Sequence, residues 1–207
     1  MKIRQFFLCA FAKCGTQKPT IFKAGMNGQI TILDKPSLRR MVSQLKAQMS
    51  PDEKARQSDS VFAQVEQLQQ FNDTRTIVAY WSLDDEVQTQ RFVEKWYRKK
   101  RIFLPVVVDD DLIFKQFIGM ADMRKGAFGI LEPTGAALTD ISSIDLVIVP
   151  GVAFDAQNNR MGRGRGFYDR ALQQSGAFKI GVAFNCQIFK QIPTIETDIP
   201  MDLVING

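Results

Sequence analysis

The sequence predicts an α/β protein, a three-layer αβα sandwich with a mostly parallel, Rossmann-like sheet. Apolar runs of strand length alternate along the chain with segments of helical periodicity, which is the pattern of such folds. The apolar run at residues 146–149 stops at Pro150-Gly151, as a central strand buried on both faces would. With 207 residues, of which 45% are hydrophobic, the chain can bury one sizeable core.

The first two helices are predicted from their caps and from their apolar spacing. Asp34 is a predicted N-cap, because its side chain can accept from free backbone N–H groups, and Pro36 fits the first turn. Residues 50–53 read S-P-D-E, a capping box with proline at the first helical position. Apolar residues follow each cap at helical spacing: Leu38, Val42, Leu45 and Met49 in the first helix, and Val61, Val65 and Leu68 in the second.

The rest of the chain alternates strands with helices. Apolar runs predict strands over residues 76–80, 102–108, 146–149, 179–184 and 203–205, and an edge strand over residues 112–118. Helices are expected over residues 87–100 and, starting near Gly166, over residues 168–174. Because parallel strands need a crossover connection, this alternation favours a mostly parallel sheet.

The first 33 residues differ from the rest of the chain. They hold five of the 27 basic residues and none of the 22 acidic residues, so residues 34–207 are formally neutral. We expect residues 1–33 to be an extension that is disordered or outside the fold, with Met26 a candidate true start. Residues 34–207 are expected to form a single domain. Targeting is the alternative. The short apolar run at residues 6–12 after two basic residues loosely resembles a signal peptide, and the basic, acid-free start loosely resembles an organelle transit segment.

Composition excludes several kinds of site and partner. Without histidine, the chain cannot use Ser-His-Asp or Cys-His catalysis or His-based zinc sites. Cys9, Cys14 and Cys186 are too few for an all-cysteine zinc site, and a sparse, odd count suits a reducing compartment such as the cytoplasm. No apolar run approaches the roughly 18 residues that span a membrane. We expect a cytoplasmic monomer with no membrane or nucleic-acid partner, although the sequence leaves an oligomer open.

The most specialised segment follows the strand at residues 146–149. Gly162, Gly164 and Gly166 let the backbone approach a ligand closely. Three arginines share the segment and bring forked donors that hold phosphate or carboxylate: Arg160, Arg163 and Arg165. In open parallel sheets ligands bind outside the carboxyl ends of the strands, and a helix expected beside the loop would offer free N–H groups to an anion. The segment therefore predicts a phosphate-binding wall.

Common nucleotide motifs do not fit this loop. Its spacing is G-x-G-x-G rather than G-x-G-x-x-G, because position 167 is Phe, and no G-K-[ST] occurs in the chain. The spacing argues against a dinucleotide-dependent oxidoreductase, which stays an alternative. A solvated arginine loop is a second alternative, disfavoured by the aromatic pair Phe167-Tyr168. An RNA contact of the RGG kind at residues 163–166 is a third, disfavoured by its single short copy.

At these residues the chain resembles the 5-formyltetrahydrofolate cyclo-ligase family. The family pattern reads approximately P-G-x-x-F-D-x-x-G-x-R-[LM]-G-x-G-[KRG]-G-[FY]-Y-D, and residues 150–169 follow it closely. Asn158-Asn159 stands where the pattern often has a glycine, a tolerable change because Asn also accepts left-handed turns. Further matches occur in the family's order at residues 35–39, 80–87, 126–133 and 198–204.

The resemblance implies an enzyme that closes 5-formyltetrahydrofolate to 5,10-methenyltetrahydrofolate. ATP would be the co-substrate and Mg²⁺ the cofactor, with ADP and phosphate released through a phosphorylated formyl intermediate. Positioning and electrostatic stabilisation suffice for such chemistry, so the missing histidine is no obstacle.

Residue roles follow from the same family match. It implies ATP binding by Lys35, Arg39, Arg160, Gly162, Arg163, Gly164, Arg165, Gly166, Phe167 and Tyr168. It implies folate contacts by Trp81, Glu86, Arg163 and Phe167, Mg²⁺ ligation by Asp169 and Asp198, and catalytic charge stabilisation by Arg163 and Arg165.

One loop position departs from many relatives, which have lysine where this chain has Arg165. Arginine keeps the positive charge and can bind two oxygens, but it cannot donate a proton at neutral pH. We expect a charge-stabilising role, in which Arg165 replaces the lysine. A catalytically silent relative with the same fold stays an alternative.

Overall fold

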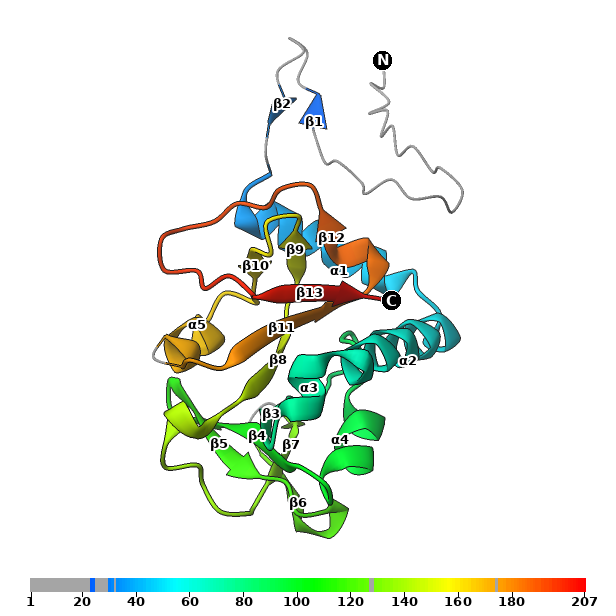
Figure 1. Cartoon of the computed structure of the whole chain (residues 1–207). Coiled ribbons are helices and arrows are strands. Elements are labelled where there is room, and N and C mark those ends of the chain that lie inside the picture. The colour runs from blue at the N-terminus through cyan, green and yellow to red at the C-terminus, as the bar shows by residue number, and fades with distance from the viewer. Residues whose placement is uncertain (1–22, 25–29, 32, 127–128, 174) are drawn as a thin grey trace.

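The computed structural model describes residues 23–24, 30–31 and 33–207, except residues 127–128 and 174 (Figure 1). Within the extension, β1 (Lys23–Ala24) pairs antiparallel with β2 (Ile30–Thr31). The apolar run at residues 6–12, the candidate start Met26, and residues 127–128 and 174 of two expected segments lie outside the described residues. The boundary expected between residues 33 and 34 stays a prediction.

A six-stranded sheet forms the centre of the molecule, with the spatial order β13-β11-β8-β3-β4-β5. Its strands are β3 (Thr76–Val78), β4 (Arg101–Val108), β5 (Asp111–Gln116), β8 (Leu146–Pro150), β11 (Phe178–Ala183) and β13 (Leu203–Asn206). Every neighbouring pair is parallel except β4 and β5, which pair antiparallel at one edge. The mostly parallel sheet and the edge position of β5 are therefore confirmed.

Helices cover both faces of this sheet, which confirms the three-layer fold (Figure 1). Leu146 and Ile148 of β8 pack in a core with α2 (Pro51–Gln67), α3 (Gln69–Asp73) and α4 (Gln90–Trp96). Val147 and Val149 pack in a second core with α5 (Phe167–Leu172) and the 3-10 helix η3 (Ile141–Ser143). The alternation follows from the pleat, which points successive side chains to opposite faces.

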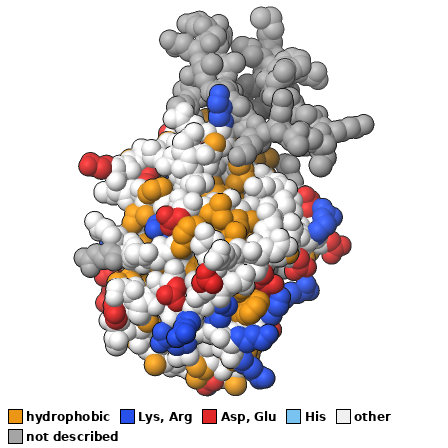
Figure 2. Space-filling view, in the orientation of Figure 1, with side chains coloured by type: hydrophobic (Ala, Val, Ile, Leu, Met, Phe, Trp, Pro, Cys, Tyr) orange, Lys and Arg blue, Asp and Glu red, His pale blue; other side chains and the backbone are white. Residues whose placement is uncertain are grey.

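Shorter elements connect these layers. They are the 3-10 helices η1 (Met120–Asp122) and η4 (Asn185–Gln187) and the antiparallel pair β6 (Met123–Lys125) and β7 (Leu131–Pro133). Among the described residues, no helix combines the length and the apolar character needed to cross a membrane. On the face in Figure 2, hydrophobic side chains are surrounded by charged side chains of both signs.

A second, three-stranded sheet of order β10-β9-β12 supports α1 (Lys35–Ala47). Its strands are β9 (Ala153–Asp155), β10 (Arg160–Met161) and β12 (Ile188–Phe189). Leu38 and Val42 of α1 pack with these strands in a third core, against which Leu33 also packs. The sequence did not predict this sheet, because strands of two or three residues are too short to show periodicity.

The hairpin between β9 and β10 turns through a residue with positive φ. Asn158 has φ 62°, which confirms that asparagine accepts a left-handed turn at this position. The buried carboxylate of Asp155 accepts hydrogen bonds from the backbone N–H groups of Gln157 and Asn159, each at 3.0 Å. These bonds hold the turn and fix where β10 begins.

The predicted caps of the first two helices are confirmed. The Asp34 carboxylate accepts a hydrogen bond from the Ser37 N–H at 2.8 Å, and the Ser50 hydroxyl accepts one from the Glu53 N–H at 3.2 Å. The expected apolar face of α1 was partly wrong, because Lys46 is buried where Leu45 was expected and Leu45 is only partly buried.

The expected helix over residues 87–100 was too long, since α4 spans only Gln90–Trp96. Two hydrogen bonds keep residues 87–89 out of the helix. The Tyr80 hydroxyl donates to the Val87 carbonyl oxygen at 2.7 Å, and the Thr89 hydroxyl donates to the Tyr80 carbonyl oxygen at 2.5 Å. Tertiary hydrogen bonds therefore override the helical pattern at this end.

Candidate active site

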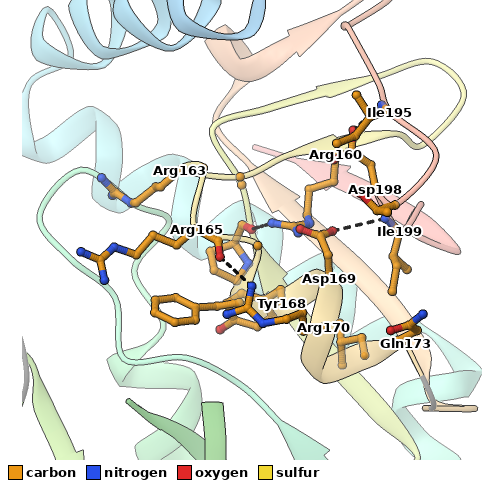
Figure 3. Close-up of a pocket in the computed structure, with 18 of the residues that line it drawn as sticks. Arg160, Arg163, Arg165, Tyr168, Asp169, Arg170, Gln173, Ile195, Asp198 and Ile199 are labelled. Atoms are coloured by element: carbon orange, nitrogen blue, oxygen red, sulfur yellow. Dashed lines mark hydrogen bonds and ion pairs between the residues drawn. The ribbon is translucent and has the colours of Figure 1, made fainter. Parts of the chain in front are cut away.

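A pocket of about 1080 Å³ lies between α1, the loop before α5 and the segment before β13 (Figure 3). Ordinary ligand pockets measure roughly 300–1,000 Å³, so this one is as large as the largest of them. Every predicted site residue except Trp81 lines it: Lys35, Arg39, Glu86, Arg160, Gly162, Arg163, Gly164, Arg165, Gly166, Phe167, Tyr168, Asp169 and Asp198. The fold thus brings together residues that lie more than 160 positions apart in the sequence, Lys35 and Asp198 being separated by 163 positions.

The loop over residues 162–166 owes its shape to two glycines in conformations that other residues rarely adopt. Gly164 has φ +108° and Gly166 has φ +66°, and Gly166 is the N-cap of α5. A Cβ atom on Gly164 would lie 3.3 Å from the Arg39 guanidinium, closer than ordinary contact. Arg39 in turn donates from Nε to the Gly162 carbonyl oxygen at 2.9 Å. The first helix and the loop are therefore fixed to one another.

Arg160 is the most buried charged side chain of the pocket, with 4% of the residue exposed. It donates to the Asp169 carboxylate at 2.8 Å and to the Pro150 carbonyl oxygen at 3.4 Å. Among the described residues, its buried Nε–H finds no hydrogen-bond acceptor. A buried, partly unsatisfied guanidinium is costly and calls for an explanation, which an anionic ligand bound at Arg160 would supply.

The two predicted metal ligands face the pocket, and each is paired with a cation. Asp169 binds Arg160 and accepts from the Ile199 N–H at 3.2 Å (Figure 3). Asp198 binds the Lys35 ammonium group at 2.5 Å and accepts from the Ile195 N–H at 2.8 Å. Among the described residues, no group of three or more Asp, Glu or Cys side chains could form a metal cage. Two carboxylates nevertheless suit Mg²⁺, which commonly takes one or two of them plus substrate phosphates and water.

Arg163 bridges the glycine loop to the acidic turn before α4. Its guanidinium donates to the Asp85 carboxylate at 2.6 Å and to the Glu86 carboxylate at 3.1 and 3.3 Å. Burial alone would lower the pKa of Arg163, but the charges of Glu86 and Asp85 outweigh it and raise that pKa. Burial alone would raise the pKa of Asp85, but hydrogen bonds and charge from Lys46 and Arg163 hold it below its usual value. Both groups are therefore charged at neutral pH.

The start of α5 supplies the aromatic side of the pocket. Burial, and secondarily the charge of Glu86, raise the pKa of Tyr168 far above its usual value, so its phenol stays neutral and can donate a hydrogen bond. The Arg165 guanidinium lies 5.9 Å from the Phe167 ring centroid, and Arg163 and Arg165 extend to the same side of the loop (Figure 3). Arg170 donates to the Arg165 carbonyl oxygen at 2.9 Å, which ties the loop to the first turn of the helix.

Trp81 is not among the described residues that line the pocket. Its ring stacks on Phe117, with centroids 5.8 Å apart, and it packs against the core beneath α2 to α4. A folate contact by Trp81 stays a prediction.

Sequence reasoning missed several residues that line the pocket, among them Arg170, Lys179 and Glu196, and it also missed Asp85 and Lys46, which lie behind Arg163. Arg170 stands one helical turn after the loop, and Asp85 lies next to Glu86, so their positions in the sequence were a signal. Lys46 follows Val42 by four residues on the apolar side of α1, where a lysine is unusual. The signal was therefore closeness to a predicted site residue for Arg170 and Asp85, and a charge on an apolar helix face for Lys46.

Comparison with known proteins identifies a family. The sequence pattern of the 5-formyltetrahydrofolate cyclo-ligase family matches residues 31–207. The 5-formyltetrahydrofolate cyclo-ligase of Haemophilus influenzae is 29% identical over 179 residues, covering 82% of this chain and 96% of that protein. Its counterpart from Escherichia coli is 29% identical over 175 residues, covering 80% of this chain and 96% of that protein.

Solved structures agree with the sequence comparison. The structure of Aquifex aeolicus 5,10-methenyltetrahydrofolate synthetase superimposes with a TM-score of 0.76 at 31% identity, covering 83% of this chain and 88% of that one. The 5,10-methenyltetrahydrofolate synthetase from Mycoplasma pneumoniae gives a TM-score of 0.69 at 27% identity, covering 84% and 99%. The family pattern covers residues 31–207, which include the loop and all the residues that line the pocket. The chain therefore belongs to the 5-formyltetrahydrofolate cyclo-ligase family and is an enzyme of the ligase class.

Proposed function

We propose that this chain uses ATP to convert 5-formyltetrahydrofolate into 5,10-methenyltetrahydrofolate, releasing ADP and phosphate. The observation that carries the proposal is one pocket of about 1080 Å³, in which cations, carboxylates and aromatic side chains from four separate segments meet. A nucleotide and a folate are both anionic and both large, and this lining suits the two together.

ATP would lie along the cationic side of the pocket. Lys35 and Arg39 reach it from α1, Arg160 reaches it from β10, and Arg165 reaches it from the loop. The buried Nε–H of Arg160 would find an acceptor in a phosphate oxygen. Gly162, Gly164 and Gly166 leave the loop backbone uncovered for phosphate contacts, and Phe167 and Tyr168 would bound the site beyond them.

Asp169 and Asp198 are the proposed ligands of Mg²⁺. When bound, the ion would neutralise negative charge on the nucleotide oxygens. Arg160 and Lys35, which pair with these carboxylates, would remain beside them as donors to the same phosphates.

The folate would lie toward Glu86. A pterin is flat and carries N–H donors, which suit a carboxylate acceptor and an aromatic face such as Phe167. Glu86 is held in place because its second carboxylate oxygen accepts from the Leu83 N–H at 3.1 Å. Arg163 would contact the anionic parts of the substrate. Trp81 is not among the described residues that line the pocket, but it stays a proposed folate contact.

The reaction needs an activated formyl oxygen. In the first step this oxygen attacks the γ-phosphorus of ATP and ADP leaves. In the second step N10 of the folate attacks the formyl carbon, the carbon–oxygen bond breaks, phosphate leaves and the N10 proton passes to solvent. Arg163 and Arg165 would stabilise the charge on the transferring phosphoryl group, and no side chain has to accept a proton.

The test follows methenyltetrahydrofolate by its absorbance. We expect product from 5-formyltetrahydrofolate only when ATP and Mg²⁺ are both present, and ADP in equal amount. Binding of both substrates without turnover would instead identify a catalytically silent relative. Tight NADH binding without ATP binding would favour the oxidoreductase alternative.

We also propose that the chain acts as a cytoplasmic monomer whose partners are small molecules. Residues 34–207 carry no net formal charge, which gives no electrostatic basis for binding nucleic acid. A single species of monomer mass in light scattering is the expected result, and a dimer at micromolar concentration would contradict it.

A further inference from the structure

Lys46 is a buried charged residue to which the proposed reaction gives no role. It lies in α1, and only 4% of its side chain is exposed. Its ammonium group donates to the Asp85 carboxylate at 2.6 Å and to the Asp85 carbonyl oxygen at 2.8 Å. Burying a lysine is costly unless the charge is paired, and the Asp85 carboxylate supplies that pairing.

The Asp85 carboxylate joins this buried lysine to the glycine–arginine loop. One of its oxygens accepts from Lys46, and the other accepts from Arg163 at 2.6 Å. Neither Lys46 nor Asp85 is among the described residues that line the pocket, whereas Arg163 is. The buried Lys46 of α1 is thereby linked, through one carboxylate, to a half-exposed guanidinium at the pocket.

Arg163 also binds Glu86, the carboxylate that would receive the pterin. An arginine whose sole acidic partner was Glu86 would cover that carboxylate and compete with the substrate for it. A second partner on the adjacent residue shares the guanidinium, since Nη2 donates to both Asp85 and Glu86, and it lowers the conformational freedom of a long side chain. Lys46 sets the position of that second partner.

We propose that Lys46 and Asp85 are positioning residues, which hold Arg163 at the pocket and leave Glu86 able to bind the folate substrate. This inference rests on the proposed function, because it assumes that Glu86 and Arg163 face the folate. Loss of the link raises the KM for 5-formyltetrahydrofolate and changes the KM for ATP little, and it lowers kcat to the extent that Arg163 stabilises the transferring phosphoryl group.

The experiment compares Lys46→Met, Asp85→Asn and Arg163→Ala, alone and in pairs, by steady-state kinetics with each substrate varied. Lys46→Met and Asp85→Asn are each expected to raise the KM for 5-formyltetrahydrofolate about tenfold, the scale of coupling between groups in one network. Combined with Arg163→Ala, neither is expected to add to the defect that Arg163→Ala causes alone. A merely structural lysine would instead lower activity by the same factor in both backgrounds.

Lys54→Met is the matched control. Lys54 lies on the neighbouring helix α2 and donates to the Asp84 carbonyl oxygen at 3.1 Å, so it contacts the same acidic turn without touching Asp85 or Arg163. We expect its KM values to stay within about twofold of the parent chain.

The outcomes separate the inference from the proposed function. Unchanged folate KM in both Lys46→Met and Asp85→Asn, or defects that multiply with that of Arg163→Ala, would overturn the inference alone. No effect of Arg163→Ala would show that the folate role proposed for Arg163 is wrong, and the inference would fall with it. If Lys46→Met does not fold, Asp85→Asn decides, because the Asp85 side chain is 41% exposed and its amide replacement keeps the same shape.

Discussion

At the scale of single residues, the pocket is organised by pairs of opposite charge. Lys35 pairs with Asp198, Arg160 with Asp169, and Arg163 with Glu86. Each pair joins segments that are distant in sequence or lie on different elements, so each pair also fixes the shape of the pocket. Removing one member leaves the other without its partner in a partly buried site, which is costlier than removing an exposed ion pair.

Arg165 tests whether positive charge alone is needed at the loop position where many relatives have lysine. We expect Arg165→Ala to lower turnover at least roughly tenfold, the scale of one lost charge-stabilising contact. Arg165→Lys is expected to keep most of the activity, because an ammonium group supplies the same charge. Steady-state kcat measured by methenyltetrahydrofolate absorbance decides, and near-normal turnover of Arg165→Ala would refute a catalytic role.

Asp85 gives a prediction about stability and pH. Hydrogen bonds and charge from Lys46 and Arg163 lower its folded-state pKa below the usual value of 3.8, despite the opposing effect of burial. The ionised group therefore stabilises the fold fully above pH 3.8, and this contribution disappears as the pH falls through the folded-state pKa. We expect Asp85→Asn to be less stable than the parent chain at pH 7.

Urea unfolding at neutral and at acid pH measures this difference. The gap in free energy of unfolding between parent and Asp85→Asn should shrink as the pH falls below 3.8. A gap that is equal at both pH values would show that the ionised carboxylate is not what stabilises the fold.

At the scale of elements, the loop before α5 depends on backbone conformation more than on side chains. Gly164→Ala would force a side chain into a left-handed conformation and bring its Cβ atom within 3.3 Å of Arg39. We expect a loss of about 1–2 kcal/mol in the free energy of unfolding, the cost of such a conformation, together with a lower kcat. Urea unfolding and turnover, measured on the same preparation, test both parts.

Gly176→Ala serves as the control for this change. A Cβ atom there would meet nothing within 4 Å, and Gly176 has no positive φ. We expect its stability and its turnover to stay close to those of the parent chain. Equal effects of the two substitutions would contradict the role given to the conformation of Gly164.

The elements that sequence predicted well are those with long periodic patterns or clear caps. The second helix, α2, was predicted from its capping box and its apolar spacing, and β8 from an unbroken apolar run. The hairpin β9–β10 and the start of α4 were not predicted, because hydrogen bonds made by Asp155, Tyr80 and Thr89 decide them. Such bonds depend on which segments meet in space and leave no local pattern.

At the scale of the whole molecule, the site forms where three parts of the fold meet. The loop and α5 pack on one face of the central sheet, α1 packs on the small sheet, and the segment before β13 completes the pocket. The arrangement agrees with the rule that ligands bind at the carboxyl ends of parallel strands. A shift of the small sheet would therefore move α1 and change the shape of the pocket, although most of the proposed ligand-binding residues lie outside that sheet.

The extension gives a prediction at this scale. We expect a truncated chain of residues 34–207 to unfold cooperatively and to keep its turnover within about twofold. Leu33 is only partly buried against the core beneath α1, so its loss should cost about 1 kcal/mol or less. Urea unfolding and kinetics of the truncated chain test this, and failure to fold or loss of activity would place the extension within the functional unit.

The sequence by itself determined the fold class, the main strands and helices, and the family, because apolar periodicity, caps and a glycine–arginine pattern are local properties of the chain. It also nominated 13 of the 24 residues that line the pocket, since those 13 match the family pattern in order. Only the tertiary structure decided that Trp81 packs on Phe117 away from the pocket lining, and that a buried Lys46 reaches Arg163 through Asp85. These arrangements join residues between 36 and 78 positions apart, Trp81 to Phe117 and Asp85 to Arg163, and no local pattern records which distant side chains will meet once the chain has packed.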